Sequence, residues 1–114
     1  MNNTLEIVKT IKEALEDKKG EDIDILDISG VTVVGDYFVV ASADNLVQLS
    51  AMKDEVEERL YKDYKLSPKN VEGKRGSSWI LIDYGDVIVH LFTREDRAFY
   101  DLERIWKDGR RVEV

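Results

Sequence analysis

The chain has 114 residues, of which 43% are hydrophobic and 36% are charged, as expected for a single folded domain with a well-hydrated surface. Its 17 basic and 24 acidic residues give a formal net charge of −7, which disfavours binding to bare nucleic acid and suits a basic protein partner. Acidic chains are also common simply because charge keeps them dissolved. The chain lacks cysteine, which excludes disulfides and thiolate zinc sites and agrees with a cytoplasmic location. No signal peptide or membrane span is recognised, so no membrane association is expected.

The first half of the chain predicts a helix, two strands and a second helix. The first helix begins at Asn3, a predicted N-cap, and ends near Gly20. Its apolar positions recur at helical spacing: Leu5, Val8, Ile11 and Leu15. Residues 22–29 and 36–42 are strand candidates, and the second is apolar enough to be buried on both faces. Asp44 or Asn45 then caps a helix whose buried stripe is Leu46, Leu49, Met52, Val56 and Leu60.

The second half predicts a connection over KLSPKNVEGKRGSS, two strands around the sequence DYGD and a last helix from about Glu95 to Trp106. The order of elements is helix, strand, strand, helix, strand, strand, helix. This order indicates an α/β (α+β) fold with a mixed β-sheet of about four to five strands and three helices. Residues 1–108 are expected to form one domain, followed by a short, frayed tail at 109–114.

The register of the hairpin follows from its turn. If Gly85 and Asp86 form a two-residue turn with glycine first, the strands pair residue by residue on two faces. One face pairs Tyr84 with Val87, Ile82 with Val89 and Ile80 with Leu91, which are all apolar and predict the core side. The other face pairs Asp83 with Ile88, Leu81 with His90 and Trp79 with Phe92.

This second face has four interpretations. A metal site would need at least three ligands, yet His90 is the only histidine and there is no cysteine. Catalysis would need a nucleophile or a substrate pocket nearby, and none is recognised. Two interpretations remain. One is a half-covered sheet face with a satisfied histidine. The other is an exposed docking face for a protein, with an aromatic centre and a polar rim. The members of that docking face would be Trp79, Leu81, Asp83, His90 and Phe92.

The last helix adds two further candidates. Its apolar positions, Phe99, Leu102, Ile105 and Trp106, fall on one arc and should pack on the sheet. Tyr100 and Glu103 lie around the other side with Arg97 and Arg104. Spacing alone favours an ordinary solvated face for these four residues.

One pair of carboxylates suggests an enzyme. Asp22 and Asp24 should share a strand face, which resembles the magnesium-binding pair of nucleotidyltransferases. Those enzymes also place a Gly-Ser pair at a helix start just upstream, and the preceding sequence EDKKGE has no serine. We therefore predict no enzymatic activity, catalytic residue, metal ligand or cofactor, and keep a magnesium-dependent nucleotidyltransferase as the alternative.

Several segments together resemble the ribosomal silencing factor (RsfS, or Iojap-like) family. They are DIDILDISG, GDYFVVAS, MKDEVEERL, NVEG, SWILIDYGDVIVHLF and RAFYDLERIW. The run W-x-L-x-D-x-G-D-x-x-x-H followed by F-Y-x-L-E-x-x-W is specific to it. The sequence departs from the family at SADNLVQLSA, where many relatives carry a Ser-Asn-Arg/Thr stretch.

The resemblance implies a function and a fold. Members of the family bind a basic protein of the large ribosomal subunit, number fourteen, at the face where the small subunit docks. They prevent the subunits from joining and so repress translation when nutrients are scarce. The family fold is similar to that of nucleotidyltransferases, which implies a nucleotidyltransferase-like topology without that activity.

The resemblance also implies roles for the candidate residues. Trp79 and Leu81, with Phe92 beside them, would supply an apolar anchor. Asp83 and Glu103 would meet basic groups on the partner, and His90 and Tyr100 would contribute hydrogen bonds or orient their neighbours. Two questions stay open: whether the free protein is a homodimer, and whether a minor contact with ribosomal RNA is made by Lys74, Arg75, Arg110 and Arg111.

Overall fold

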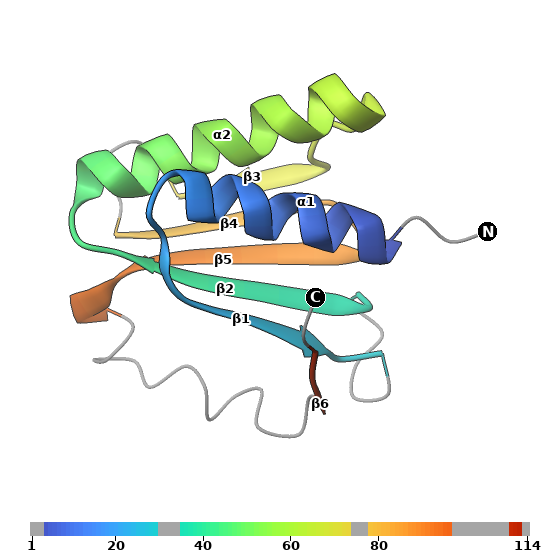
Figure 1. Ribbon diagram of the computed structural model, residues 1–114, viewed down its shortest axis with the longest axis horizontal. Helices are drawn as coiled ribbons and strands as arrows, with labels where there is room; N and C mark the ends of the chain where they lie inside the picture. Colours follow the sequence, from blue (N-terminus) through green and yellow to red (C-terminus); the bar gives the residue numbers. More distant parts are fainter. Residues whose placement is uncertain (1–3, 30–34, 74–77, 97–109, 113–114) are drawn as a thin grey trace.

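The computed structural model describes residues 4–29, 35–73, 78–96 and 110–112, which form a mixed sheet with two helices on one face (Figure 1). The helices are α1 (Thr4–Asp17) and α2 (Leu46–Tyr64). The strands are β1 (Glu21–Asp27), β2 (Tyr37–Ala43), β3 (Asn70–Glu72), β4 (Trp79–Asp83), β5 (Val87–Thr93) and β6 (Arg110–Arg111). Residues 94–96 are helical, where the third helix was predicted to begin, and the rest of that helix lies outside the described residues. Neither α1 nor α2 combines the length and the apolar character that crossing a membrane requires.

The sheet confirms the predicted mixed α+β class. Its strand order is β3-β4-β5-β2-β1-β6. The central pair β2 and β5 is parallel, and the other neighbours are antiparallel. The sheet has six strands, where four to five were predicted. The edge strands β3 and β6 are only three and two residues long, which makes them hard to recognise in the sequence. β3 lies in a segment that was read as a connection, and β6 lies in the segment that was expected to be a frayed tail.

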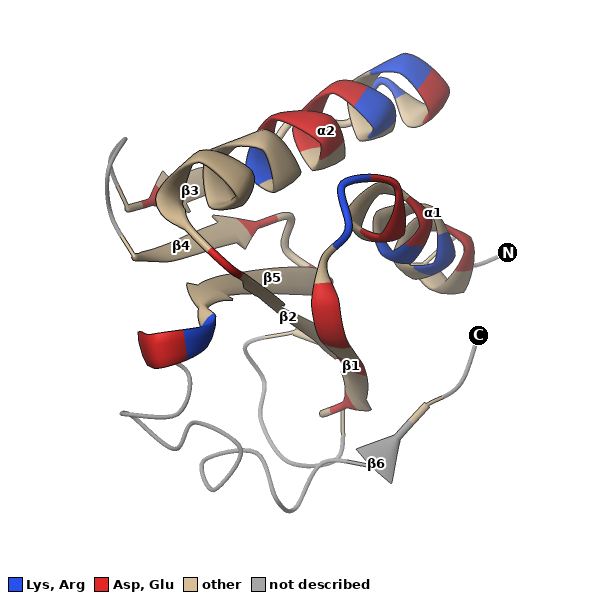
Figure 2. Ribbon diagram, turned by 60° about the vertical axis from the view of Figure 1, so that its left-hand side comes forward, with Lys and Arg blue, Asp and Glu red and all other residues tan. Residues whose placement is uncertain are grey.

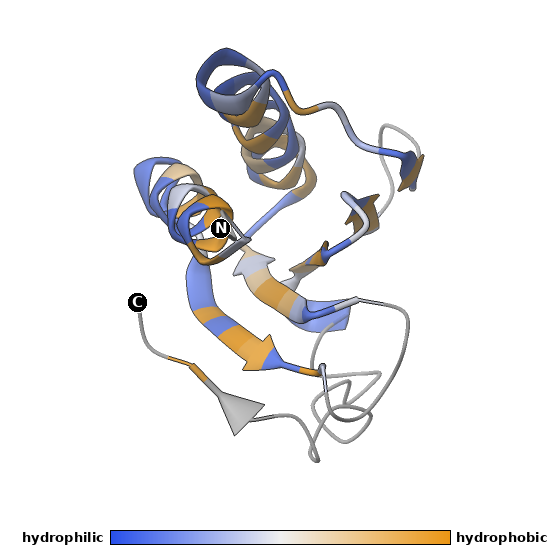
Figure 3. Cartoon of the chain, turned by 90° about the vertical axis from the view of Figure 1, so that its right-hand side faces the viewer, coloured by the Kyte–Doolittle hydropathy of each residue, from blue (hydrophilic) through white to orange (hydrophobic). Residues whose placement is uncertain are grey.

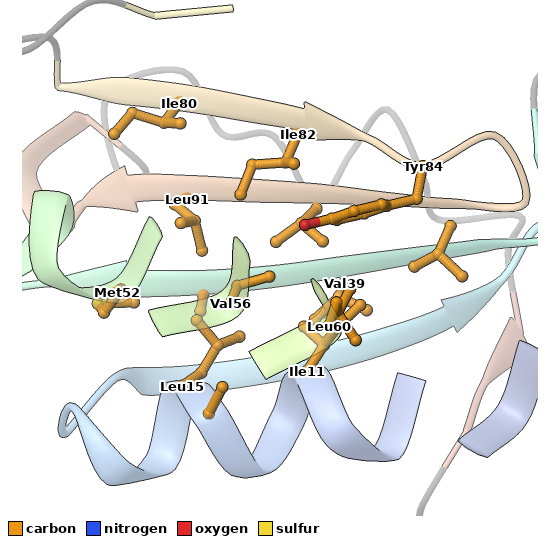
Figure 4. Close-up of a cluster of buried hydrophobic side chains, with 14 of the residues drawn as sticks. Ile11, Leu15, Val39, Met52, Val56, Leu60, Ile80, Ile82, Tyr84 and Leu91 are labelled. Carbon is orange, nitrogen blue, oxygen red and sulfur yellow. The ribbon is translucent and has the colours of Figure 1, made fainter. Parts of the chain in front are cut away.

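The main core lies between the sheet and the two helices. Figure 3 shows hydrophobic positions on the sides of α1 and α2 that face the sheet, and Figure 4 shows their side chains meeting those of the strands. The helices contribute Val8, Ile11, Leu15, Leu49, Met52, Val56 and Leu60, and the strands contribute Ile25, Val39, Ile80, Ile82, Val89 and Leu91. Each fully buried aliphatic side chain in this layer contributes roughly 2 kcal/mol through removal of its surface from water.

The predicted helical stripes are confirmed except at their first positions. Leu5 is 46% exposed and Leu46 is 44% exposed. Each lies in the first turn of its helix, α1 beginning at Thr4 and α2 at Leu46. Helical spacing tells which side of a helix is apolar, but it does not tell where along the helix the sheet begins to cover it.

The start of α2 is held to the end of α1 by one side chain. Asn45 is the N-cap, and its side chain accepts a hydrogen bond from the backbone N–H of Gln48. The Gln48 Oε1 atom accepts a bond from the N–H of Asp44. Its Nε2 atom donates to the carbonyl oxygens of Lys18 and Lys19 at 3.0 and 2.9 Å. Gln48 therefore joins the cap of α2 to the turn that leads from α1 into β1.

Replacing Gln48 by alanine is expected to lower the free energy of unfolding by about 1–2 kcal/mol, because the two carbonyls and the Asp44 N–H lose their side-chain partner. Urea unfolding followed by circular dichroism measures this loss. Glu58→Ala is the matched control, since Glu58 is exposed on the same helix. Equal stability of the two variants would contradict the proposed role of Gln48.

Candidate functional site

The hairpin of β4 and β5 has the predicted register. Ile80 pairs with Leu91 and Ile82 with Val89, and on the other face Trp79 pairs with Phe92, Leu81 with His90 and Asp83 with Ile88. Tyr84, Val87 and the other residues predicted for the core side are buried against the helices. The prediction of the two hairpin faces is therefore confirmed.

The turn of the hairpin is stabilised both by its own residues and by the backbone at the start of β2. Gly85 has φ 91°, a left-handed conformation in which glycine meets no steric penalty. The Asp83 Oδ1 atom accepts a hydrogen bond from the Gly85 N–H at 2.7 Å. The carbonyl of Asp86 accepts bonds from the N–H groups of Asp36 and Tyr37 at 2.8 and 3.0 Å. Asp83, predicted to meet a partner, thus also stabilises the turn.

The second face of the sheet is buried at its centre. Phe92 is 0% exposed and His90 is 5% exposed, so the expectation that both lie on an exposed docking face is wrong. Both belong to β5, which lies between β4 and β2 in the interior of the sheet. Phe92 belongs to a second apolar layer with Ile28, Phe38, Val40 and Ile88, and the His90 ring lies against Phe38 and Phe92 of this layer. Alternation along a strand assigns a residue to a face, but it does not tell whether that face is covered.

Four rings form a cluster within this layer. The ring centroids of Phe38 and His90 are 4.9 Å apart in an edge-to-face arrangement, and those of His90 and Phe92 are 6.2 Å apart and parallel within 2°. The Trp79 ring lies 5.1 Å from that of Phe92 and 6.4 Å from that of His90. Burial lowers the pKa of His90 to about 4, since an imidazolium among these rings would lose its hydration. At neutral pH His90 is an uncharged support for the rings around it.

The exposed part of this face lies toward the sheet edge. Trp79 is 39% exposed, and Leu81 and Asp83 are half-buried. Glu72 of β3 pairs with Leu81, so its side chain belongs to the same face. We call Glu72, Trp79, Leu81 and Asp83 the edge patch. Acidic segments of β3 and of the end of β4 are visible in Figure 2.

A small pocket of about 220 Å³ opens in the edge patch, lined by Glu72, Gly73, Trp79 and Leu81. Gly73 has φ 98°, and a Cβ atom there would lie 2.4 Å from the carbonyl oxygen of Trp79. Only glycine lets the chain pass so close to β4, and this approach forms one wall of the pocket. Sequence reasoning missed both Glu72 and Gly73, because it treated NVEG as part of a connection. The positions of two other candidates, Tyr100 and Glu103, lie outside the described residues.

The carboxylates of β1 are arranged differently from the prediction. Glu21 pairs with Ser42 and Asp24 with Val40, so the register shifts between them and the strand contains a bulge. Asp22 lies in this bulge with φ 51°. The bulge interrupts the alternation that would have put Asp22 and Asp24 on one face, and Glu21 takes that place instead. Over residues 4–29, 35–73, 78–96 and 110–112, no three histidine, aspartate or glutamate side chains form a group that could hold a metal ion.

The fold and the edge patch define a small α+β domain with an exposed aromatic side chain bordered by carboxylates at one edge of its sheet. The sequence profile described as "Ribosomal silencing factor during starvation" matches residues 1–114. The Bacillus subtilis ribosomal silencing factor RsfS is 35% identical over 94% of this chain and 90% of its own length. RsfS of Chromobacterium violaceum is 39% identical over 89% of this chain and 82% of its own length. A crystal structure of a protein from Chromobacterium violaceum superimposes with a TM-score of 0.86 and 37% identity, covering 94% of this chain and 88% of that one.

The chain therefore belongs to the RsfS family, which confirms the resemblance noted in its sequence.

Proposed function

We propose that this protein binds the large ribosomal subunit through its basic ribosomal protein number fourteen and thereby keeps the subunits apart. The observation that supports this most directly is the family match over the whole chain, 1–114, together with an edge patch suited to a basic protein. The effect is steric: a 13.1 kDa domain occupies the surface that the small subunit needs. Translation in the cytoplasm is then repressed when nutrients are scarce.

The edge patch has the composition of a protein interface. Trp79 and Leu81 supply an apolar centre, and Asp83 and Glu72 supply carboxylates at the rim. Interfaces of this kind bury roughly 800 Å² per partner, and one or two residues contribute most of the affinity. The rings of His90 and Phe92 lie on the buried side of Trp79 and hold its ring in position, with centroids 6.4 and 5.1 Å from the Trp79 centroid. Tyr100 and Glu103 remain proposed contacts.

The direct test is sedimentation of purified ribosomal subunits with and without this protein, at a magnesium concentration that favours joining. We expect separated subunits, with the protein in the large-subunit fraction. Intact ribosomes together with protein at the top of the gradient would contradict the proposal.

Raising the salt concentration should weaken binding, because the partner is basic and the patch carries carboxylates.

A double variant tests the alternative of a nucleotidyltransferase. Asp22→Asn with Asp24→Asn should leave binding to the large subunit unchanged, since Asp22 lies in the β1 bulge and neither residue belongs to the edge patch. Loss of subunit separation in the folded double variant would point back to those two carboxylates.

A further inference from the structure

We propose that the pocket beside Trp79 receives one apolar side chain of the partner, and that the Glu72 carboxylate at its rim pairs with a neighbouring lysine or arginine of that partner. This inference rests on the proposed function and adds to it the chemistry of the segment that is recognised: an apolar residue flanked by a basic one.

The size of the pocket suits a side chain. Its volume is about 220 Å³, whereas sites for small organic molecules usually span about 300–1,000 Å³. Trp79 and Leu81 give it apolar walls, and Gly73 brings the backbone close enough to complete it. An aliphatic or aromatic side chain that enters the pocket would move from water into contact with apolar walls that are formed before binding.

The walls of the pocket are held rigidly. The Trp79 ring lies 5.1 Å from the ring of Phe92, which is fully buried. Leu81 packs against the same buried layer. A pocket that is formed before binding costs little ordering entropy when it is filled, which is the usual property of an interface anchor.

The charge at the rim points to a basic segment. Four carboxylates of the described chain pair with arginine: Arg94 bridges Glu21 and Asp44, and Arg59 bridges Asp17 and Glu55. Glu72 is exposed, and its hydrogen-bond partner is the neutral amide of Asn70 at 3.1 Å. Within the described segments, no lysine or arginine forms an ion pair with Glu72. Its negative charge lies at the rim of the pocket, where it would attract a basic group of a partner and disfavour phosphate.

Two pairs of variants test the inference, with purified large subunits of Bacillus subtilis as the probe and cosedimentation as the readout. Leu81→Phe fills the pocket and should weaken binding by at least about 30-fold. Its control is Val47→Phe, which adds the same ring at an exposed position on α2. Glu72→Lys should weaken binding by at least about tenfold and reduce its salt dependence, whereas Glu58→Lys makes the same charge change on α2 and should do neither.

The outcomes separate this inference from the proposed function. If the unmodified chain does not sediment with the large subunit, both fall together. If it binds and Trp79→Ala abolishes binding while folded Leu81→Phe and Glu72→Lys bind as tightly as their controls, only the pocket is refuted. If Leu81→Phe fails to fold, Glu72→Lys and Glu58→Lys still test the basic group at the rim, and equal binding of these two variants refutes the inference as stated.

Discussion

Replacing Trp79 by alanine is expected to weaken binding to the large ribosomal subunit by at least about 30-fold, which corresponds to about 2 kcal/mol. Trp79 is the one aromatic side chain of the edge patch, and it forms a wall of the pocket. Its loss removes the apolar centre of the interface and opens the pocket to water. Cosedimentation of the variant with large subunits at fixed salt measures the effect.

The same substitution should leave the fold intact. Trp79 is 39% exposed, so its removal should lower the free energy of unfolding by about 2 kcal/mol or less. Phe92→Ala is the informative comparison, because Phe92 is fully buried and its loss should cost about 3–5 kcal/mol. A Trp79→Ala variant that unfolds as easily as Phe92→Ala would contradict the assignment of Trp79 to the surface. A variant that binds like the unmodified chain would contradict its role in binding.

Local sequence was sufficient wherever a pattern runs for several residues. The turn at Gly85 and Asp86 set the register of the whole hairpin, and all five pairings of β4 with β5 follow from it. The apolar run of β2 predicted a strand buried on both faces, and its residues from Phe38 to Ala43 are buried. The cap of α2 was predicted at Asp44 or Asn45 and is Asn45, and the stripe beyond Leu46 is as predicted, because both depend on contacts within a few residues.

Local sequence was insufficient wherever the answer depends on distant parts of the chain. β3 and β6 are three and two residues long, and segments of that length carry no periodic signal. The bulge at Asp22 arises from pairing with β2 and is not written in the spacing of the aspartates. Whether the second face of the hairpin is covered depends on its position in the sheet, so His90 and Phe92 were assigned to the correct face but with the wrong exposure.

Burial assigns two different roles to residues of the family-matching run SWILIDYGDVIVHLF. His90 and Phe92 lie in the buried layer, where their rings support the buried side of the Trp79 ring. Trp79 and Leu81 lie at the margin of that layer, where a partner can reach them. A residue in such a run can therefore be required for binding without touching the partner. Binding and stability have to be measured together for each variant.

Acidification is expected to destabilise the protein through His90. Burial lowers the pKa of His90 to about 4 in the folded chain, against about 6.5 in an unfolded one. Between these two values the unfolded chain binds more protons, so stability is full above about pH 6.5 and falls as the pH drops toward 4. The loss between pH 7 and pH 5 attributable to His90 is about 2 kcal/mol.

The His90→Leu variant isolates this contribution, because it replaces the imidazole by an apolar side chain of similar size that does not titrate. The difference in unfolding free energy between the two proteins, measured with urea at pH 7 and again at pH 5, should shift by about 2 kcal/mol in favour of the variant. The rings that surround His90, those of Phe38, Trp79 and Phe92, are uncharged. Parallel loss of stability in both proteins would mean that His90 is not the group responsible. A shift of about 2 kcal/mol would instead show that the imidazole next to the Trp79 ring stays uncharged in the folded protein over this pH range, so that the ring keeps its support down to about pH 5.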